Sequence, residues 1–263
     1  AAFADAKTDQ RLENSRKVFE SFSNLTEQSI PTWLLDRAYG IVVVPGVVKV
    51  ALTLGGRGGK GVMAVRNPDG SWSDPVFVTL AGGSIGFQFG VQSTDVVLVL
   101  MSRQSVEGIA GGKVTLGGDA SVAAGPLGRA ASANTDATFK AQVLSYSRNE
   151  GLFAGVALDG TVISVDNSAN ETAYGVSGVL PSQILEGKIA GTPPAAADFK
   201  AALTRATDKS AAAAPPQPPT SLSVDGQTPA VPAAPAAPST AAPQPGATTY
   251  PMEDPNPGAP PPK

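Results

Sequence analysis

The sequence contains no histidine and no cysteine among its 263 residues. This absence excludes Ser-His-Asp and Cys-His nucleophile systems, zinc sites built on imidazole or thiolate, and axial His or Cys ligands to haem. It also excludes disulfides, but it leaves the redox compartment open because an exported protein can lack them. Carboxylates, hydroxyls, Lys, Arg and Tyr are the reactive groups that remain. We therefore expect a protein that is not an enzyme, with no catalytic residue, no metal and no cofactor.

The sequence also lacks a large net charge and a long apolar run. Its formal net charge of −3 indicates no general affinity for nucleic acid, whose phosphate backbone rewards clustered Lys and Arg. No apolar run approaches the roughly 18 residues that span a bilayer. Ala2-Phe3-Ala4 resembles the small-residue end of an export signal. We expect export to the periplasm or cell envelope and a peripheral place at the membrane, with any lipid anchor upstream of residue 1.

Proline is concentrated near the end of the chain, where 16 of the 24 prolines follow Ala214. Ala, Pro, Gln and Thr dominate this stretch and aromatic residues are nearly absent, so it cannot bury enough apolar surface to offset the entropy of ordering it. Four parts are expected. They are an amphipathic N-terminal helix region (1–30), a β-rich domain (31–191), a short helix (192–209) and a disordered Pro/Ala-rich tail (210–263) that serves as a spacer.

Apolar residues three or seven positions apart predict an amphipathic helix from Ala6 to about Phe22. In one interpretation its apolar stripe packs on the core. In the other the helix lies on a bilayer, and the residues that contact lipid are Leu12, Arg16, Lys17, Phe19 and Phe22. A second short helix is expected to begin near Pro31 and to end at Gly40.

Glycine and β-branched residues dominate the middle of the chain, with 26 of 29 glycines between Gly40 and Gly191. Short β-branched runs separated by glycine predict strands, which we expect at 41–44, 47–54, 61–66, 72–79, 83–91, 95–101, 112–116, 120–124, 139–147, 152–158 and 161–165. Turn signals such as Asp159-Gly160 make neighbouring strands antiparallel. Glycines inside strands favour curvature. The expected fold class is α+β, with a mainly antiparallel Gly-rich curved sheet or partly closed barrel and N-terminal helices.

The segment from Gly55 to Gly61 formally contains G-x-G-x-x-G, but a nucleotide site is rejected. The dinucleotide fingerprint needs a helix after it, whereas residues 62–65 continue as strand. A Walker loop needs Ser or Thr after its lysine, and Gly61 follows Lys60. Residues 166–171 likewise fail as a calcium loop, because Glu171 stands where the sharp turn needs Gly. We expect an ordinary polar loop there.

The charge around the glycine-rich segment is more informative than its glycine pattern. Between Arg37 and Asn67 the sequence has five basic residues and no acid. A basic block around a glycine loop with unobstructed N–H groups predicts a site for a phosphorylated lipid head group, and the candidate residues are Lys49, Arg57, Lys60 and Arg66. The alternative is a hairpin tip with turn glycines and solubilising charges.

Six segments in order between about Pro31 and Gly187 carry a family likeness. They are residues 55–59 (GGRGG), 69–75 (DGSWSDP), 123–129 (AAGPLGR), 146–156 (YSRNEGLFAGV), 173–175 (AYG) and 184–187 (ILEG). As an ordered series they resemble the SYLF domain family. The resemblance implies a lipid-binding module without enzymatic activity, because eukaryotic relatives bind phosphoinositides, yeast relatives also bind actin, and bacterial relatives are often exported. It further implies lipid contact through the N-terminal helix and Lys49.

The sequence therefore predicts a non-catalytic module that binds anionic, phosphoinositide-like head groups at a membrane surface. The alternative is an envelope module for protein interaction or structure, spaced by the Pro-rich tail. The expected partner is an anionic lipid or membrane surface, with a protein partner second, and neither nucleic acid nor nucleotide is expected.

Overall fold

The computed structural model describes residues 6–23, 29–51, 55–84, 90–127, 140–149, 152–155 and 158–213. The chain divides into a compact unit, residues 1–216, and a second unit, residues 217–263. The second unit lies wholly outside the described residues, as does the predicted tail from residue 214 onward. Every helix and strand given below belongs to the first unit.

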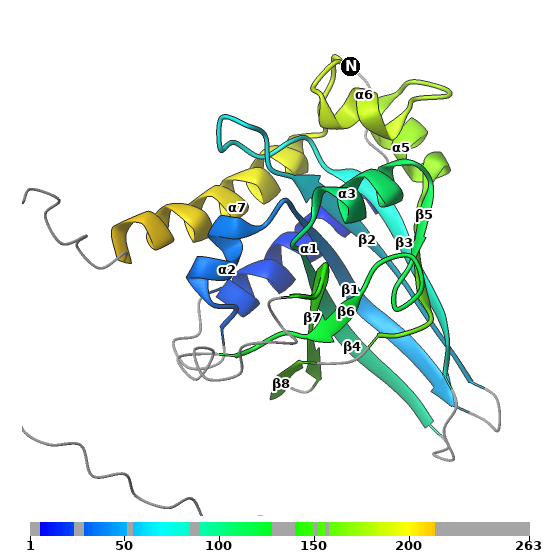
Figure 1. Ribbon diagram of the computed structural model, residues 1–263. Helices are drawn as coiled ribbons and strands as arrows, with labels where there is room; N and C mark the ends of the chain where they lie inside the picture. Colours follow the sequence, from blue (N-terminus) through cyan, green and yellow to red (C-terminus); the bar gives the residue numbers. More distant parts are fainter. Residues whose placement is uncertain are drawn as a thin grey trace, which may run out of the picture. The chain divides into compact units, whose positions relative to one another are not determined.

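The first unit is built on one curled sheet, which Figure 1 shows wrapping between two groups of helices. Its described strands are β1 (Gly40–Ala51), β2 (Gly55–Val65), β3 (Val76–Ser84), β4 (Gly90–Leu100), β5 (Lys113–Thr115), β6 (Val122–Ala124), β7 (Val143–Asn149), β8 (Leu152–Gly155) and β9 (Thr161–Val165). The strand order is β5-β9-β3-β2-β1-β4-β7-β6, and β8 pairs with β7. The named strand pairs are antiparallel except for the parallel pair β6–β7. The predicted α+β class with a curled, half-barrel sheet is confirmed.

Helices cover both faces of this sheet. They are α1 (Ala6–Ser23), α2 (Thr32–Arg37), α3 (Arg103–Ala110), α5 (Asn167–Tyr174), α6 (Pro181–Leu185) and α7 (Pro194–Ala213). The helices expected at the N-terminus, after Pro31 and near 195–209 are confirmed, although α7 continues to Ala213 and so enters the segment predicted as tail. No described helix is long and apolar enough to cross a membrane.

Three helices were not expected, and two of them begin at a capping side chain. Ser102 Oγ accepts a hydrogen bond from the Ser105 amide at 3.1 Å and starts α3. Asp166 Oδ1 accepts from the Ala169 amide at 3.2 Å and starts α5. The prediction of a polar loop over 166–171 is therefore wrong, because the Asp that suggested a turn is a helix N-cap.

The glycine-rich segment is a strand and not a loop, which corrects the predicted start of β2 at residue 61. It pairs with β1 on one side and β3 on the other. A Cβ on Gly61 would lie 2.1 Å from the Val43 carbonyl oxygen, so glycine is needed here for close approach of two strands.

Further strand boundaries differ from expectation. The strands predicted at 72–79 and 139–147 begin later, at Val76 and Val143. The runs predicted at 41–44 and 47–54 form the single strand β1, which is bent by an irregularity between Val44 and Val47, where Gly46 has φ of 55°. The two ends of the strand predicted over 83–91 belong to different strands, since residues 83–84 end β3 and residues 90–91 begin β4; residues 85–89 lie outside the described part.

The core lies on both faces of the sheet. On one face α1 packs against β1, β2 and α7, and its Leu12, Phe19 and Phe22 are fully buried. Helix α7 adds Phe199 and Leu203, also fully buried. Each such side chain contributes about 1.5–3 kcal/mol relative to exposure, so the N-terminal helix is part of the folded domain.

Candidate functional site

Lys49 and Arg57 lie directly opposite each other on β1 and β2. Direct partners in an antiparallel pair project to the same face, and like charges placed this way repel each other. Lys49 is exposed and Arg57 is half-buried. Neither forms an ion pair with any residue that the structure describes. The two cations therefore make an uncompensated positive pair.

Two buried polar atoms flank Gly82 beside Arg57. Gly82 on β3 is the partner of both Arg57 and Thr161 of β9. A Cβ on Gly82 would lie 3.1 Å from Thr161 Oγ1 and 3.4 Å from Arg57 Cγ. Both Thr161 Oγ1 and Arg57 Nε are buried and have no hydrogen-bond partner in the described part of the chain. A buried guanidinium nitrogen and a buried hydroxyl oxygen thus lie on either side of Gly82, which has no side chain.

Lys60 does not join this pair. It lies three residues along β2 from Arg57, and side chains alternate between faces, so it projects to the opposite side of the sheet. Its Nζ is 3.9 Å from Asp166 Oδ2, and its side chain is 69% exposed. Asp166 is held more closely by Arg11, both of whose terminal nitrogens donate to Oδ2 at 3.1 Å.

Arg66 lies at the other end of β2, nine residues and about 30 Å from Arg57. Its Nη1 donates to the carbonyl oxygens of Leu35 at 3.2 Å and Asp36 at 2.9 Å. Its guanidinium also lies 5.5 Å from the centre of the Trp72 ring. Arg66 therefore ties α2 to the sheet. The structure brings together Lys49 and Arg57 but separates Lys60 and Arg66 from them.

The residues predicted to contact a membrane through α1 point elsewhere. Leu12, Phe19 and Phe22 have no exposed surface. The apolar stripe of α1 therefore packs on the core, which is the first of the two interpretations of this helix. Arg16 hydrogen-bonds Glu13 and Glu20, and Lys17 lies 3.3 Å from Glu13. The Arg16 hydrogen bonds lower the pKa of Glu13 to about 2. The apolar side chains assigned to lipid contact are unavailable to lipid in this conformation.

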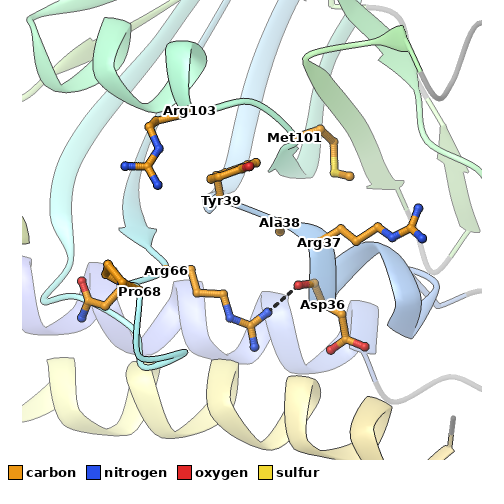
Figure 2. Close-up of a pocket in the computed structure, with 9 residues that line it drawn as sticks. Asp36, Arg37, Ala38, Tyr39, Arg66, Pro68, Met101 and Arg103 are labelled. Carbon is orange, nitrogen blue, oxygen red and sulfur yellow. Dashed lines mark hydrogen bonds between the residues drawn. The ribbon is translucent and has the colours of Figure 1, made fainter.

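A second basic site lies around Tyr39, in an open pocket of about 530 Å³ (Figure 2). Its cations are Arg37 from α2, Arg66 after β2 and Arg103 from α3. The Arg103 guanidinium lies 5.8 Å from the centre of the Tyr39 ring, and Tyr39 is 42% exposed. The sequence showed Arg37 and Arg66 as members of one basic block. It contained no signal that would place Arg103 with Arg37 and Arg66, because α3 was not predicted and Arg103 is far from both residues along the chain.

The acids at turns are engaged locally. Asp69 accepts hydrogen bonds from the Ser71 hydroxyl at 2.7 Å and the Ser71 amide at 2.9 Å, which lower its pKa. Asp119 accepts from the Thr115 amide at 2.8 Å, which lowers its pKa in the same way. Within the described ranges, no group of three or more His, Cys, Asp or Glu residues could hold a metal ion. These carboxylates stabilise turns.

The fold and its sites define a class: an α+β domain with a curled sheet that presents two basic surfaces at opposite ends of one strand. A family model described as Ysc84, Las17-binding protein actin regulator, matches residues 81–206. The domain belongs to this SYLF family, as its sequence blocks predicted.

Several named relatives are similar to this chain. Protein YSC84 of Saccharomyces cerevisiae is 40% identical over 173 residues, which cover 65% of this chain and 36% of the relative. SH3 domain-containing YSC84-like protein 1 of Bos taurus is 34% identical over 199 residues, which cover 73% of this chain and 58% of the relative. LAS seventeen-binding protein 3 of Saccharomyces cerevisiae is 39% identical over 175 residues, which cover 65% of this chain and 37% of the relative. The matched region is therefore only part of each relative. One of the three relatives is named for binding, and none of the three is named for catalysis.

Proposed function

We propose that the domain binds anionic phosphorylated head groups at a membrane surface through Lys49 and Arg57. The observation that carries this proposal is the cation pair itself, which no carboxylate in the described ranges compensates. A phosphate placed between the two side chains would remove their repulsion and accept hydrogen bonds from the Lys49 ammonium and the Arg57 guanidinium. Figure 1 shows the ends of β1 and β2 extending beyond the helices, where a membrane can approach them.

The head-group proposal is narrower than the one made from sequence. Lys60 and Arg66 are left out because the first projects from the opposite face and the second holds α2. The helix α1 is left out because its apolar stripe is buried. Export to the periplasm or cell envelope stays a prediction.

Co-sedimentation with anionic vesicles tests the head-group proposal. Each Lys or Arg near an anionic surface contributes about 1 kcal/mol, so Lys49→Ala/Arg57→Ala should weaken binding about 30-fold. Binding by the unmodified protein should also fall as salt is raised. The matched control is Lys60→Ala, which removes one exposed cation from the opposite face and should leave most binding intact. Equal sedimentation of the double variant and the unmodified protein would contradict the assignment.

A second candidate is a protein-interaction module. The observation in its favour is that the matching family model and one of the relatives are named for binding Las17. In that case the domain would bind a protein partner in a capture experiment but would not sediment with vesicles at any ionic strength. The two candidates are therefore separated by the same vesicle experiment followed by a partner-capture experiment.

A further inference from the structure

A second hollow adjoins the pocket around Tyr39. The second hollow has a volume of about 250 Å³ and is lined in part by Trp33, Arg37, Met101 and Lys140. Arg37 and Met101 also line the pocket of about 530 Å³. The two hollows therefore adjoin each other, and the surface that they make together, over α2, the start of α3 and the approach to β7, is called here the Arg37 groove.

The Arg37 groove is strongly basic. Its cations are Arg37, Arg66, Arg103 and Lys140. Asp36 is the one acid among the lining residues of these two hollows. Arg37, Arg103 and Lys140 form no ion pair with any residue that the structure describes. A ligand with several carboxylates or phosphates would supply the missing counter-charges.

The cations are spread along the groove and do not converge. Figure 2 shows Arg37 and Arg103 on opposite sides of Tyr39, with their guanidinium groups directed away from each other. Arg66 lies between them, but its Nη1 is already occupied by two backbone carbonyl oxygens. A single compact phosphate group needs donors that meet at one point. The observed spacing instead suits an extended chain that carries separated negative charges.

Aromatic and apolar side chains alternate with these charges. Arg103 lies over Tyr39, and Arg37 lies 5.8 Å from the centre of the Trp33 ring. Met101 adds a flexible apolar contact where the two hollows join. Arg, Tyr, Trp and Met are the residue types enriched in protein–protein interfaces, and Arg, Tyr and Trp dominate their binding energy. The lining of the groove is therefore typical of peptide recognition and unlike a purely ionic surface.

We propose that the Arg37 groove docks an acidic segment of a partner protein. Carboxylates of that segment would pair with Arg37 and Arg103, and its apolar side chains would contact Tyr39 and Trp33. This site is distinct from the Lys49 and Arg57 pair, because Arg66 of the groove and Arg57 lie about 30 Å apart along β2. The domain would then hold a membrane at one end of its sheet and a protein at the other.

Fluorescence anisotropy with a labelled peptide of alternating Glu-Glu-Phe units, about twelve residues long, tests the groove. A peptide of the same length with Gln in place of Glu measures the contribution of charge. The test variant is Arg37→Ala/Arg103→Ala, because these two side chains make ring contacts but do not hold the fold as Arg66 does. The control variant is Lys60→Ala/Lys188→Ala, which removes two exposed cations outside the groove.

The Glu peptide should bind the full chain at low salt, and the Gln peptide should bind at least about tenfold more weakly. Arg37→Ala/Arg103→Ala should lose at least about tenfold in affinity for the Glu peptide, whereas the control should match the unmodified protein. Failure of the Glu peptide to bind, or equal binding by the Arg37→Ala/Arg103→Ala variant, would overturn the proposal.

Vesicle sedimentation of the same variants separates this site from the head-group site. Arg37→Ala/Arg103→Ala should sediment with anionic vesicles as the unmodified protein does, and Lys49→Ala/Arg57→Ala should bind the Glu peptide normally. If Arg37→Ala/Arg103→Ala loses vesicle binding but retains peptide binding, the groove is a lipid site and the proposal of a protein segment is wrong.

Discussion

At the residue scale, two buried tyrosines differ in whether their hydroxyl groups are hydrogen-bonded. Tyr146 and Tyr174 are 0% and 2% exposed. The Tyr174 hydroxyl donates to the Pro75 carbonyl oxygen at 2.7 Å. The Tyr146 hydroxyl has no hydrogen-bond partner among the residues that the structure describes. A satisfied buried hydroxyl stabilises a fold, whereas an unsatisfied one costs free energy.

The two hydroxyls should therefore respond oppositely to removal. Tyr174→Phe leaves the buried Pro75 carbonyl without its donor and should lower the free energy of unfolding by about 1–3 kcal/mol. Tyr146→Phe removes an unpaired group and should leave the free energy of unfolding unchanged or raise it. Urea unfolding followed by circular dichroism measures both. A larger loss in Tyr146→Phe than in Tyr174→Phe would show that the Tyr146 hydroxyl has a partner.

At the element scale, the path of β2 depends on glycine at one position in particular. Gly61 lies against the backbone of β1, where an added Cβ would be 2.1 Å from the Val43 carbonyl oxygen and 2.8 Å from Val44 Cα. Backbone atoms cannot move aside as the end of a flexible side chain can. The tight pairing of β1 with β2 also fixes Lys49 opposite Arg57, so this contact positions the proposed head-group site.

Gly61→Ala should therefore destabilise the domain by about 1–3 kcal/mol or more, because the added methyl group forces β1 and β2 apart. Gly83→Ala is the matched control on the neighbouring strand, since nothing lies within 4 Å of an added Cβ there. The control should stay within about 0.5 kcal/mol of the unmodified protein. Thermal unfolding of the two variants measures the difference, and equal midpoints would mean that β1 and β2 tolerate the extra atom.

At the scale of the whole molecule, folding keeps both phenols neutral. Burial raises the pKa of Tyr146 and of Tyr174 well above their ordinary value of 10.0, and Asp74 raises that of Tyr174 further. The unfolded chain ionises these groups near pH 10, whereas the folded chain resists ionisation. Stability from this source is present below pH 10 and is lost as the pH rises above it.

The alkaline limb of the stability curve should consequently become shallower in Tyr146→Phe. The measurement is the free energy of unfolding from pH 8 to pH 11 in the unmodified protein and in this variant. Below pH 10 the two curves should run parallel, and above pH 10 the unmodified protein should lose stability faster. Parallel curves over the whole range would show that the Tyr146 phenol ionises as easily in the folded chain as in the unfolded one.

Much of the architecture follows from local patterns. The apolar stripe of α1 predicted its helix, and β-branched runs bounded by glycine predicted most of the strands and the curled sheet. The order of short blocks also identified the SYLF family. Helices α3 and α5 were not predicted, because Ser102 and Asp166 look like turn residues until their side chains are seen to cap a helix.

The candidate site was harder to predict than the fold. Sequence proximity grouped Lys60 with Arg57, but strand alternation places them on opposite faces once the segment is known to be a strand. It also grouped Arg66 with Arg57, although an extended strand separates them by about 30 Å. Arg103 was overlooked because it reaches the Tyr39 pocket through a helix from elsewhere in the chain.

The sequence by itself determined the class of the protein: composition excluded imidazole and thiolate chemistry, and local periodicity specified helices, strands and a family. Only the tertiary structure decided which cations act together and whether the stripe of α1 faces the core or the surroundings. The physical reason is that periodicity reports local backbone geometry, whereas a charge cluster depends on strand register and on contacts between residues far apart in the chain.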